Sequence, residues 1–509
     1  MFTAQVDRKS LGERLDAGFY HPEYLLLDDH LASRGAVQLH TVVDGVSCGP
    51  FGGNAIADDL YAEEGVFFIR PLNITSNIFD ESSLVKVPKQ LLLDNRLKIY
   101  SGKNLYFGRV GVPCVAIIDA ETSISPNIII ARLDESLADP EYLYAFSSSV
   151  YGLTQLKRQL KEVAQPTTST EAVNNLKVFL PDVKSQKYIG DKVRQAERLR
   201  AWAKKVEADI TVFHQQLIPD QSKLDFSRKT RFVGFVRMTE RFDAHFYPGV
   251  VEDYLSLKNC GFKPLGELAS TVFNGQTQDE TEGAGAVEQI TVANLSRTYI
   301  NGQPRRVIKP SNSSKLTKKH DLLICNAAHN KSYIGRDVTY YHSEKSVLPS
   351  TEVMVIRVDR ELLPASFVRS YLLTQLGFVQ IQSTIRGITA HSYPVDMKRL
   401  EIPIPSVPDS LKHDWFACDD RMVLAGQACE VATRLISTTK FLVEALIEGL
   451  VTEQQLICAQ QALDADDNSL EREILGRLTT KGLDGDGEPL FVDLDQLYDL
   501  LAQCQQMDE

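Results

Sequence analysis

Basic side chains collect in two stretches of the chain, and clusters of this kind are suited to binding phosphate groups. The stretch from Arg297 to His320 contains no acidic residue and carries Arg297, Arg305, Arg306, Lys309, Lys315, Lys318 and Lys319. An earlier stretch, with Asp94 as its one acid, carries Lys86, Lys89, Arg96, Lys98, Lys103 and Arg109. Each phosphate neutralised by Lys or Arg releases condensed counterions, so both stretches are candidate nucleic-acid contacts. The alternative is a solvated charged face.

Polar side chains on the neighbouring loops add candidates for contacting bases. Readout at a groove edge needs Arg, Lys, Asn or Gln, because these types form bidentate hydrogen bonds with bases. Six loop residues qualify by type: Asn54, Arg70, Asn73, Asn274, Gln276 and Asn294. The full candidate set is Asn54, Arg70, Asn73, Lys86, Lys89, Lys103, Arg109, Asn274, Gln276, Asn294, Arg297, Arg305, Arg306, Lys318 and Lys319.

Catalytic and metal-binding patterns are not found in the sequence. There is no phosphate-binding Gly-rich loop, no His-Glu-X-X-His, no Gly-X-Ser-X-Gly and no Asn/Asp-Pro-Pro-Tyr/Phe motif. The eight cysteines are scattered without metal-ligand spacing, which favours buried thiols. We therefore expect a chain with no catalytic residues and no metal.

The net charge of −12 is distributed unevenly. Residues 451–509 carry 14 acidic and 3 basic side chains, whereas the first 450 residues carry 53 and 52. The body is therefore nearly neutral, and the last 59 residues form an acidic extension. This extension could dock a protein, mimic DNA, or be a solvated appendage; its leucine spacing favours docking, and Leu494–Leu501 predicts a short helix.

The elements that must position the candidate residues occur twice. Glu-Arg-Leu-Asp-Ala, one variable residue and Phe-Tyr (13–20) return 227 positions later as Glu-Arg-Phe-Asp-Ala, one variable residue and Phe-Tyr (240–247). Residues 125–134 likewise match 350–359 at an offset of 225. A repeat this long implies two whole domains, not the short units of a solenoid.

Each half has a strand-rich front and a helical back. Val/Ile/Phe runs bounded by Gly, Pro, Asn and Asp predict strands at 66–69, 115–118, 127–130, 322–324 and 353–356. Apolar residues then recur every three or four positions after each front, which predicts one long helix per half. Equivalent places in the repeat favour an antiparallel helix pair; two unrelated amphipathic helices are the alternative.

The predicted fold is α+β, with two tandem domains separated by long helices that form an antiparallel coiled-coil spacer, followed by the acidic extension. The predicted boundaries are 1–182 for the first domain and 183–218 for its helix, then 219–239 for a linker. The second domain is 240–408, its helix is 409–450, and the extension is 451–509.

The chain resembles the specificity (S) subunits of type I restriction-modification systems over about residues 13–450. In the first half the resemblance is carried by Gly-Pro-Phe-Gly-Gly (49–53), Ile-Arg-Pro-Leu-Asn-Ile (69–74), Gln-Pro-Thr-Thr (165–168) and the Gln186…Ile189 helix start. The second half diverges, with Asn274-Gly275 for the Gly-rich loop and His-Ser-Tyr-Pro (391–394) for the Thr-rich segment. Glu-Ala-Leu-Ile-Glu-Gly (444–449) resembles the close of the family's second conserved helix.

This resemblance implies a non-catalytic subunit whose two target recognition domains each read one half of a split site in double-stranded DNA. Its helical spacer would dock two methyltransferase (modification) subunits, and a restriction/motor subunit can join. No cofactor is implied for this chain, because S-adenosylmethionine binds the methyltransferase partner. No signal peptide or long apolar run is present, so the expected location is cytoplasmic, with no membrane partner.

Two other functions remain open from the sequence. One is an antiphage-defence scaffold or adaptor that binds proteins instead of DNA. The other is an enzyme acting on nucleic acid, which would need a catalytic arrangement that the sequence does not reveal.

Overall fold

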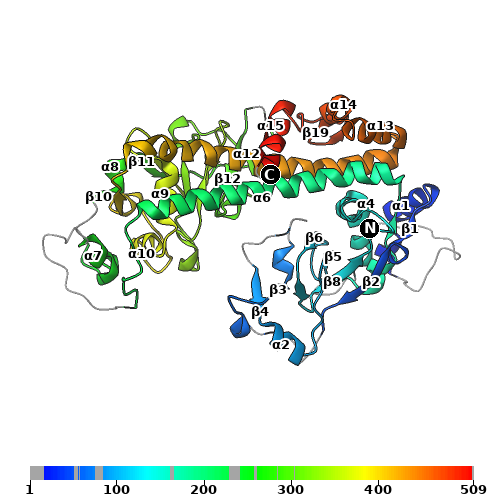
Figure 1. Cartoon of the computed structure of the whole chain (residues 1–509), viewed down its shortest axis with the longest axis horizontal. Helices are drawn as coiled ribbons and strands as arrows, with labels where there is room; N and C mark the ends of the chain where they lie inside the picture. The colour runs from blue at the N-terminus through cyan, green and yellow to red at the C-terminus, as the bar shows by residue number, and fades with distance from the viewer. Residues whose placement is uncertain are drawn as a thin grey trace. The chain divides into compact units, whose positions relative to one another are not determined.

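A computed structural model describes residues 16–50, 56, 58–74, 79, 84–160, 166–227, 241–256, 261–283, 285–302 and 304–506. The chain forms two compact units (Figure 1). The first unit comprises Met1–Glu197 and Ala432–Ala502, and the second comprises Arg198–Val431 and Gln503–Glu509. Within the described ranges, no helix combines the length and the apolar character needed to cross a membrane.

The first unit is built on short strands and helices before its long helix. Its strands are β1 (Val37–Gln38), β2 (Val43–Cys48), β3 (Val66–Ile69), β4 (Val85–Val87), β5 (Lys103–Gly108), β6 (Val115–Asp119), β7 (Thr122–Ile124), β8 (Ile128–Leu133) and β9 (Lys177–Val178). Its shorter helices are α1 (Pro22–Ser33), α2 (Lys89–Asp94), α3 (Pro140–Ser148), α4 (Val150–Gln159) and α5 (Thr170–Asn174). The strands predicted near 66–69, 115–118 and 127–130 are confirmed as β3, β6 and β8.

The second unit repeats this order. Its strands are β10 (Gly261–Pro264), β11 (Ala269–Asn274), β12 (Val287–Ile290), β13 (Arg305–Val307), β14 (Leu322–Cys325), β15 (Val338–Tyr340), β16 (Leu348–Pro349), β17 (Val353–Val358) and β18 (Glu401–Ile404). Its shorter helices are α7 (Gly249–Leu255), α8 (Leu265–Leu268), α9 (Ala365–Leu372), α10 (Gln375–Ser383) and α11 (Pro394–Met397). The predictions at 322–324 and 353–356 are confirmed as β14 and β17.

The sheets of the two units have the same topology. A four-stranded antiparallel sheet has the order β2-β8-β5-β6 in the first unit and β11-β17-β14-β15 in the second. A three-stranded sheet has the order β4-β3-β7 or β13-β12-β16, each with one parallel pair. A core of buried Ile, Val, Leu and Tyr side chains lies between these two sheets in each unit. The duplication predicted from the sequence is therefore a duplicated fold, of class α+β.

A buried glutamine makes the same pair of hydrogen bonds in both units. Gln155 on α4 receives the backbone N–H of Lys177 at 2.8 Å and donates to its carbonyl at 3.0 Å. Gln380 on α10 does the same with Glu401, at 2.9 and 3.2 Å. Each glutamine thereby fastens the strand that precedes the long helix, β9 or β18, to a shorter helix, and buried backbone groups need such partners.

The Phe-Tyr pair of the repeated motif also packs alike. Phe19 and Tyr20 meet edge to face at 5.1 Å, and Phe246 and Tyr247 meet in the same way at 5.1 Å. Edge-to-face geometry places the positive rim of one ring against the negative face of the other.

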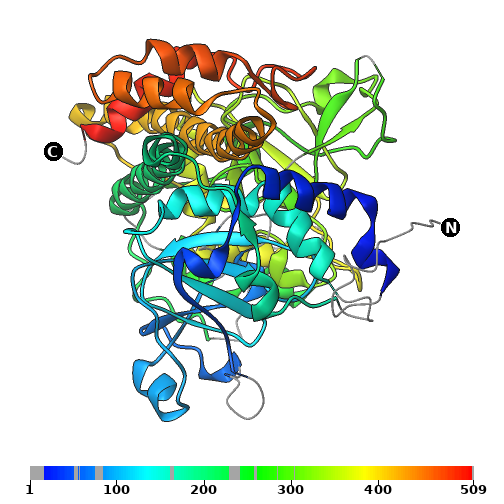
Figure 2. The ribbon, with the colours of Figure 1, turned by 90° about the vertical axis from the view of Figure 1, so that its right-hand side faces the viewer.

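The long helices are α6 (Val183–Leu217) and α12 (Asp409–Glu448), each of which begins in one unit and ends in the other. In the second unit Arg421 of α12 lies 3.9 Å from Asp209 of α6. In the first, the N–H of Asp182 before α6 donates to Glu453 after α12 at 2.9 Å. Residue numbers rise along one helix and fall along the other, so the pair is antiparallel, as Figures 1 and 2 show. The residues of the predicted linker from 228 onward lie outside the described ranges.

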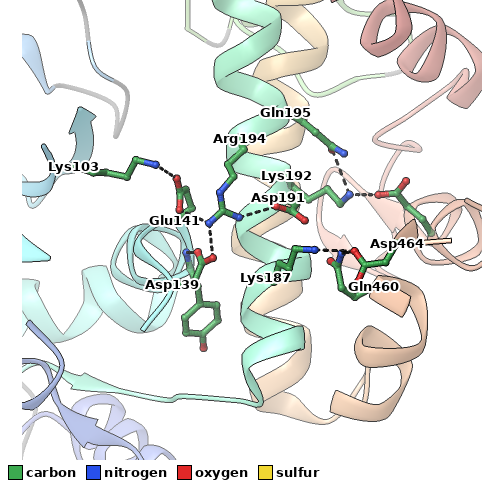
Figure 3. Close-up of polar contacts among 12 residues, drawn as sticks. Lys103, Asp139, Glu141, Lys187, Asp191, Lys192, Arg194, Gln195, Gln460 and Asp464 are labelled. Atoms are coloured by element: carbon green, nitrogen blue, oxygen red, sulfur yellow. Dashed lines mark hydrogen bonds and ion pairs between the residues drawn. The ribbon is translucent and has the colours of Figure 1, made fainter. Parts of the chain in front are cut away.

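The acidic extension folds against its own chain. It contains α13 (Glu453–Leu463), α14 (Ser469–Gly476), β19 (Leu478–Thr479), β20 (Gly482–Leu483) and α15 (Leu494–Gln505), the last of which confirms the predicted helix. Lys187 of α6 pairs with Asp464 at 2.8 Å (Figure 3). Lys192 of the same helix pairs with Glu471. Lys192 is 0% exposed and Glu471 2%, so this part of the chain is packed and is not a solvated appendage.

Candidate nucleic-acid interface

One end of each four-stranded sheet gathers loops from distant parts of the sequence. Because its strands are antiparallel, the end of β11, the start of β17, the end of β14 and the start of β15 lie at the same edge. We call this the loop edge of the second unit, comprising 274–277, 326–336, 350–352 and 386–393. In the first unit the loop edge comprises 48–50, 109–114, 125–127 and 166–168.

A glycine at the end of the first strand allows each loop edge to close. A Cβ atom on Gly49 would lie 2.2 Å from the carbonyl oxygen of Ser125, and one on Gly275 would lie 2.0 Å from that of Pro349. The contacted atoms are backbone and can move only at a cost in stability, so both positions favour glycine. Asn274-Gly275 therefore does stand where the Gly-rich loop of the first half stands.

In the first unit, two loops at the edge are joined by backbone hydrogen bonds. Gly111 N–H donates to Pro166 at 3.1 Å, and Thr168 N–H donates to Arg109 at 2.8 Å. Candidate residue Arg109 therefore lies at this edge, and its guanidinium donates to the carbonyl of Pro126 at 3.3 Å. Val112, at the tip of the loop, is 84% exposed. Asn54 lies outside the described residues.

In the second unit the equivalent loops are joined in the same way. Ala328 N–H donates to Ala390 at 3.4 Å, and Ser392 N–H donates to Asn326 at 2.8 Å. The segment His391–Ser392 thus takes the place of Thr167–Thr168, as the sequence predicted. The residues that precede His391 form a turn at 387–390.

The arginine of the repeated motif holds the base of this turn. Arg241 is 7% exposed; it donates to the carbonyl of Thr384 at 3.1 Å and lies 3.5 Å from the Asp396 carboxylate. Arg386, at the start of the turn, donates from Nε to the same carboxylate at 2.6 Å. Hydrogen bonding with Asp396 raises the pKa of Arg386 above its ordinary value. Hydrogen bonding with Arg241 lowers the pKa of Asp243. The buried carboxylate of Asp396, 0% exposed, is thus balanced by two guanidinium groups.

Two predicted base readers, Asn274 and Gln276, meet at the loop edge of the second unit. The side chain of Gln276 is exposed, while its backbone N–H donates to Pro349 at 2.8 Å and its carbonyl accepts from Gln289 at 3.0 Å. Asn274 is half-buried, and its side-chain oxygen has no hydrogen-bond partner among the described residues. Lys315 donates to the Asn274 carbonyl at 2.8 Å. The exposed side chain of Gln276, on a backbone held by hydrogen bonds, is suited to contacting a ligand edge, whereas the side-chain oxygen of Asn274 is buried.

Two other predicted readers, Asn73 and Asn294, are buried, and this corrects their assignment. Asn73 is 0% exposed, and its side-chain oxygen accepts the N–H of Arg70 at 2.9 Å. Asn294 is 7% exposed; it accepts the N–H of Thr291 at 2.9 Å and donates to Asn301 at 2.9 Å. Both cap a short 3₁₀ turn after equivalent strands, β3 and β12. Their amide edges are occupied, so they position the backbone and do not face a ligand.

Lys103 is also a structural residue. It starts β5, at the end of the sheet opposite the loop edge, and pairs with Glu141, which is 0% exposed (Figure 3). Arg194 of α6 pairs with the same carboxylate at 2.6 Å and with Asp139 at 2.5 Å. The Lys103 ammonium therefore neutralises a buried acid, and Arg194 of α6 contributes to the same neutralisation.

Most of the remaining candidates lie away from the loop edges. Arg70 is the exception, because it follows Ile69, whose carbonyl accepts the N–H of the loop-edge residue Ser125 at 2.9 Å. Lys86 lies 5.5 Å above the ring of Phe67, and Arg70 lies 5.2 Å above that of Tyr61. Lys89, Arg305 and Lys319 form surface ion pairs of 2.7, 3.1 and 3.0 Å with Glu121, Glu280 and Glu344. Three further basic candidates are exposed at the surface: Arg297, Arg306 and Lys318. Arg109 of the first basic stretch lies at the first loop edge, and Lys315 of the second contacts Asn274 at the second. The other basic residues lie elsewhere on the units, so neither stretch forms one continuous patch at its loop edge.

Sequence reasoning did not select Ile388 or His391 as side chains of the second loop edge. It also did not select Arg241, which holds the base of the turn at this edge. Arg241 had a signal, because it belongs to the repeated motif. Ile388 had none, because an isolated isoleucine normally predicts burial.

Comparisons with known proteins give structural similarity alone. No protein-family model matches the sequence, and no curated protein does. One similar structure, on complex assembly and conformational transition of the type I R-M system, is 16% identical, with a TM-score of 0.28, covering 83% of this chain and 96% of the other. The HsdS subunit from Thermoanaerobacter tengcongensis is 16% identical, with a TM-score of 0.26, covering 82% and 96%. The S subunit of the type I restriction-modification system from M. genitalium is 11% identical, with a TM-score of 0.33, covering 83% and 95%.

Proposed function

We propose that this chain is the DNA sequence-specificity subunit of a type I restriction-modification or related defence complex. Each unit reads one half of a bipartite site in double-stranded DNA through its loop edge. The chain docks two methyltransferase subunits, a restriction/motor subunit can join, and the complex acts in the cytoplasm. The chain itself performs no catalysis; S-adenosylmethionine is bound by the methyltransferase partner.

The observation that carries this proposal is that one loop edge is built twice. Both units have a glycine whose Cβ would clash with backbone, two equivalent loop-to-loop hydrogen bonds and the same pair of glutamine hydrogen bonds to the strand before the long helix. Selection on stability alone does not require both loop edges to keep these features. A split recognition site requires two comparable reading surfaces, because phosphate contacts position a protein and base contacts specify the sequence.

The side chains differ where the backbones agree, and this difference also supports the proposal. At equivalent positions the first unit has Thr167 and the second has His391; Pro50 follows Gly49, whereas Gln276 follows Gly275. Equal backbones with unequal side chains are expected for two half-sites of different sequence.

Charge also bears on how the complex binds DNA. The first 450 residues are almost neutral, and several basic residues pair with acids of the same chain. We therefore assign a large share of the phosphate contacts to the partner subunits, while this chain supplies base contacts.

Methylome sequencing of a host with and without this chain, in the presence of its methyltransferase partner, tests the function. We expect one bipartite methylated motif to disappear on deletion and to return on complementation. An unchanged methylome contradicts the proposal and favours the protein-binding adaptor. A chain with Gly275→Ala should fail to complement, whereas Gly261→Ala, with no atom within 4 Å of the added Cβ, should succeed.

A further inference from the structure

The turn at the loop edge of the second unit carries an aliphatic side chain fully into solvent. Arg386 and His391 exchange backbone hydrogen bonds of 2.8 and 3.2 Å, which makes 387–390 the tip of a small hairpin. Gly387 has φ +77°, a conformation that favours glycine, and Ile388 follows it with a relative exposure of 107%. Isoleucine is among the residue types most often found buried.

The tip is held firmly from below. The hydroxyls of Thr384 and Ser392, both buried, are hydrogen-bonded at 2.6 Å across the base of the hairpin. Arg386 donates to the carboxylate of Asp396, and Arg241 lies 3.5 Å from the same carboxylate. The exposure of Ile388 is therefore a fixed feature of the fold.

A shallow hollow of about 380 Å³ lies beside the tip, lined by Arg386, Gly387, Thr389, His391, Tyr393 and Val395. None of these residues carries a carboxylate. The rings of His391 and Tyr393 are stacked, with centroids 6.3 Å apart, and the Arg386 guanidinium lies 5.8 Å from the Tyr393 centroid. A surface that is apolar at its tip, aromatic at its side and free of acids is compatible with the edge of a base pair.

The first unit provides an independent parallel. Val112 is 84% exposed at its loop edge, at the tip of the loop that pairs with Pro166 and Thr168. An exposed branched aliphatic side chain thus occurs at the same edge of the same sheet in both units. Single exposed apolar residues are common, but two at equivalent edges suggest a shared use.

We propose that the tip 387–389 reads a thymine, with the Ile388 side chain contacting its C5-methyl group in the major groove. This inference rests on the proposed function and specifies one contact within it. The major groove admits a two-stranded ribbon, and the thymine methyl is the one apolar group that it displays. The tip residues Gly387, Ile388 and Thr389 present methyl and methylene groups and no charge.

The test uses the complex of the full chain with its methyltransferase partner and a duplex that carries the methylated motif found by sequencing. Each thymine of the half-site read by the second unit, on both strands, is replaced singly by deoxyuridine, which removes the methyl group alone. Binding is measured by competition. For the native chain we expect one replacement to weaken binding about fourfold, the worth of one buried methyl group.

Ile388→Ala should weaken binding to the thymine duplex by a similar factor and should lose the deoxyuridine penalty at that position. Folding should be unaffected, because the side chain is fully exposed. The matched control is Leu362→Ala, 50% exposed in the turn after β17 at the other end of the sheet, which should keep the full penalty.

Three results would overturn the inference: a half-site without thymine, no deoxyuridine penalty in the native chain, or an undiminished penalty in Ile388→Ala. If Ile388→Ala weakens both duplexes equally, the tip contacts a partner protein or another part of the DNA. If the complex recognises no motif, the proposed function itself fails, and this is known before any modified duplex is made.

Discussion

Removing one charge of the buried Lys192–Glu471 ion pair should release α14 from α6. The two side chains are 0% and 2% exposed, and the second oxygen of Glu471 accepts the Tyr498 hydroxyl at 2.6 Å. Glu471→Gln keeps the size and the tyrosine contact but leaves the Lys192 ammonium buried without a counter-charge. Breaking a pair of this kind costs about 3–5 kcal/mol. This corresponds to an increase of about two to four powers of ten in local opening, since about 1.4 kcal/mol is tenfold.

Hydrogen exchange of peptides from α14, followed by mass spectrometry, measures this opening directly. Lys187→Met is the matched control, because it also removes a cation of α6 that pairs with the extension. The side chains of this pair, Lys187 and Asp464, are 47% and 51% exposed. An exposed pair is worth at most about 1 kcal/mol, so exchange should rise less than tenfold. Lys192→Met combined with Glu471→Leu should restore much of the protection, because no unpaired charge remains. Equal exchange in Glu471→Gln and Lys187→Met would refute this account of the extension.

Three further predictions concern the units themselves. Gly275→Ala should destabilise the second unit by about 2 kcal/mol or more, because its Cβ would lie 2.0 Å from the Pro349 carbonyl, while Gly261→Ala should change the melting temperature little; equal melting temperatures would contradict the packing argument. Gln380→Leu removes both hydrogen bonds to β18 and should cost about 2–4 kcal/mol in chemical denaturation, and a loss below about 0.5 kcal/mol would show that these hydrogen bonds are dispensable. Burial lowers the pKa of His214 to about 4, so the folded chain binds fewer protons than the unfolded chain between pH 6.5 and about 4. The contribution of neutral His214 to the free energy of unfolding, about 3 kcal/mol at most, is present above pH 6.5 and is lost as the pH falls toward 4. His214→Gln should therefore show a flatter loss of stability over that pH range, and an unchanged slope would contradict it.

The duplication and the regular elements could be predicted from the sequence because they depend on local pattern. Strand punctuation located β3, β6, β8, β14 and β17, and the three-four spacing located both long helices. A constant offset between the halves is visible without any structure.

The candidate site was harder to predict, because burial and long-range pairing decide it. Asn73 and Asn274 are both loop asparagines by sequence, yet one is 0% exposed in a capping turn and the other lies at the loop edge. Lys103 lies in a basic stretch, but its ammonium forms an ion pair with Glu141, 38 residues away. Residue type at a loop therefore selected two residues that lie at the second loop edge, Asn274 and Gln276, and two that are buried, Asn73 and Asn294.

The tip at Ile388 shows a second limit of sequence reasoning. The exposure of Ile388 follows from a hairpin that Arg386 and His391 close and that Asp396 anchors. These three residues do not form a sequence motif that would predict the hairpin. Hydropathy alone assigns isoleucine to the core.

The central claim is that each loop edge reads its own half of a bipartite site, and single-molecule methylome sequencing of a host carrying Gln276→Ala tests it most directly. Gln276 is exposed at the second loop edge, so its truncation removes a polar contact and leaves the fold intact. We predict that one half of the methylated motif relaxes at one position while the other half stays unchanged. Equal changes in both halves of the motif would contradict the account. So would an unchanged methylome in a host whose chain carries both Gln276→Ala and Asn274→Ala.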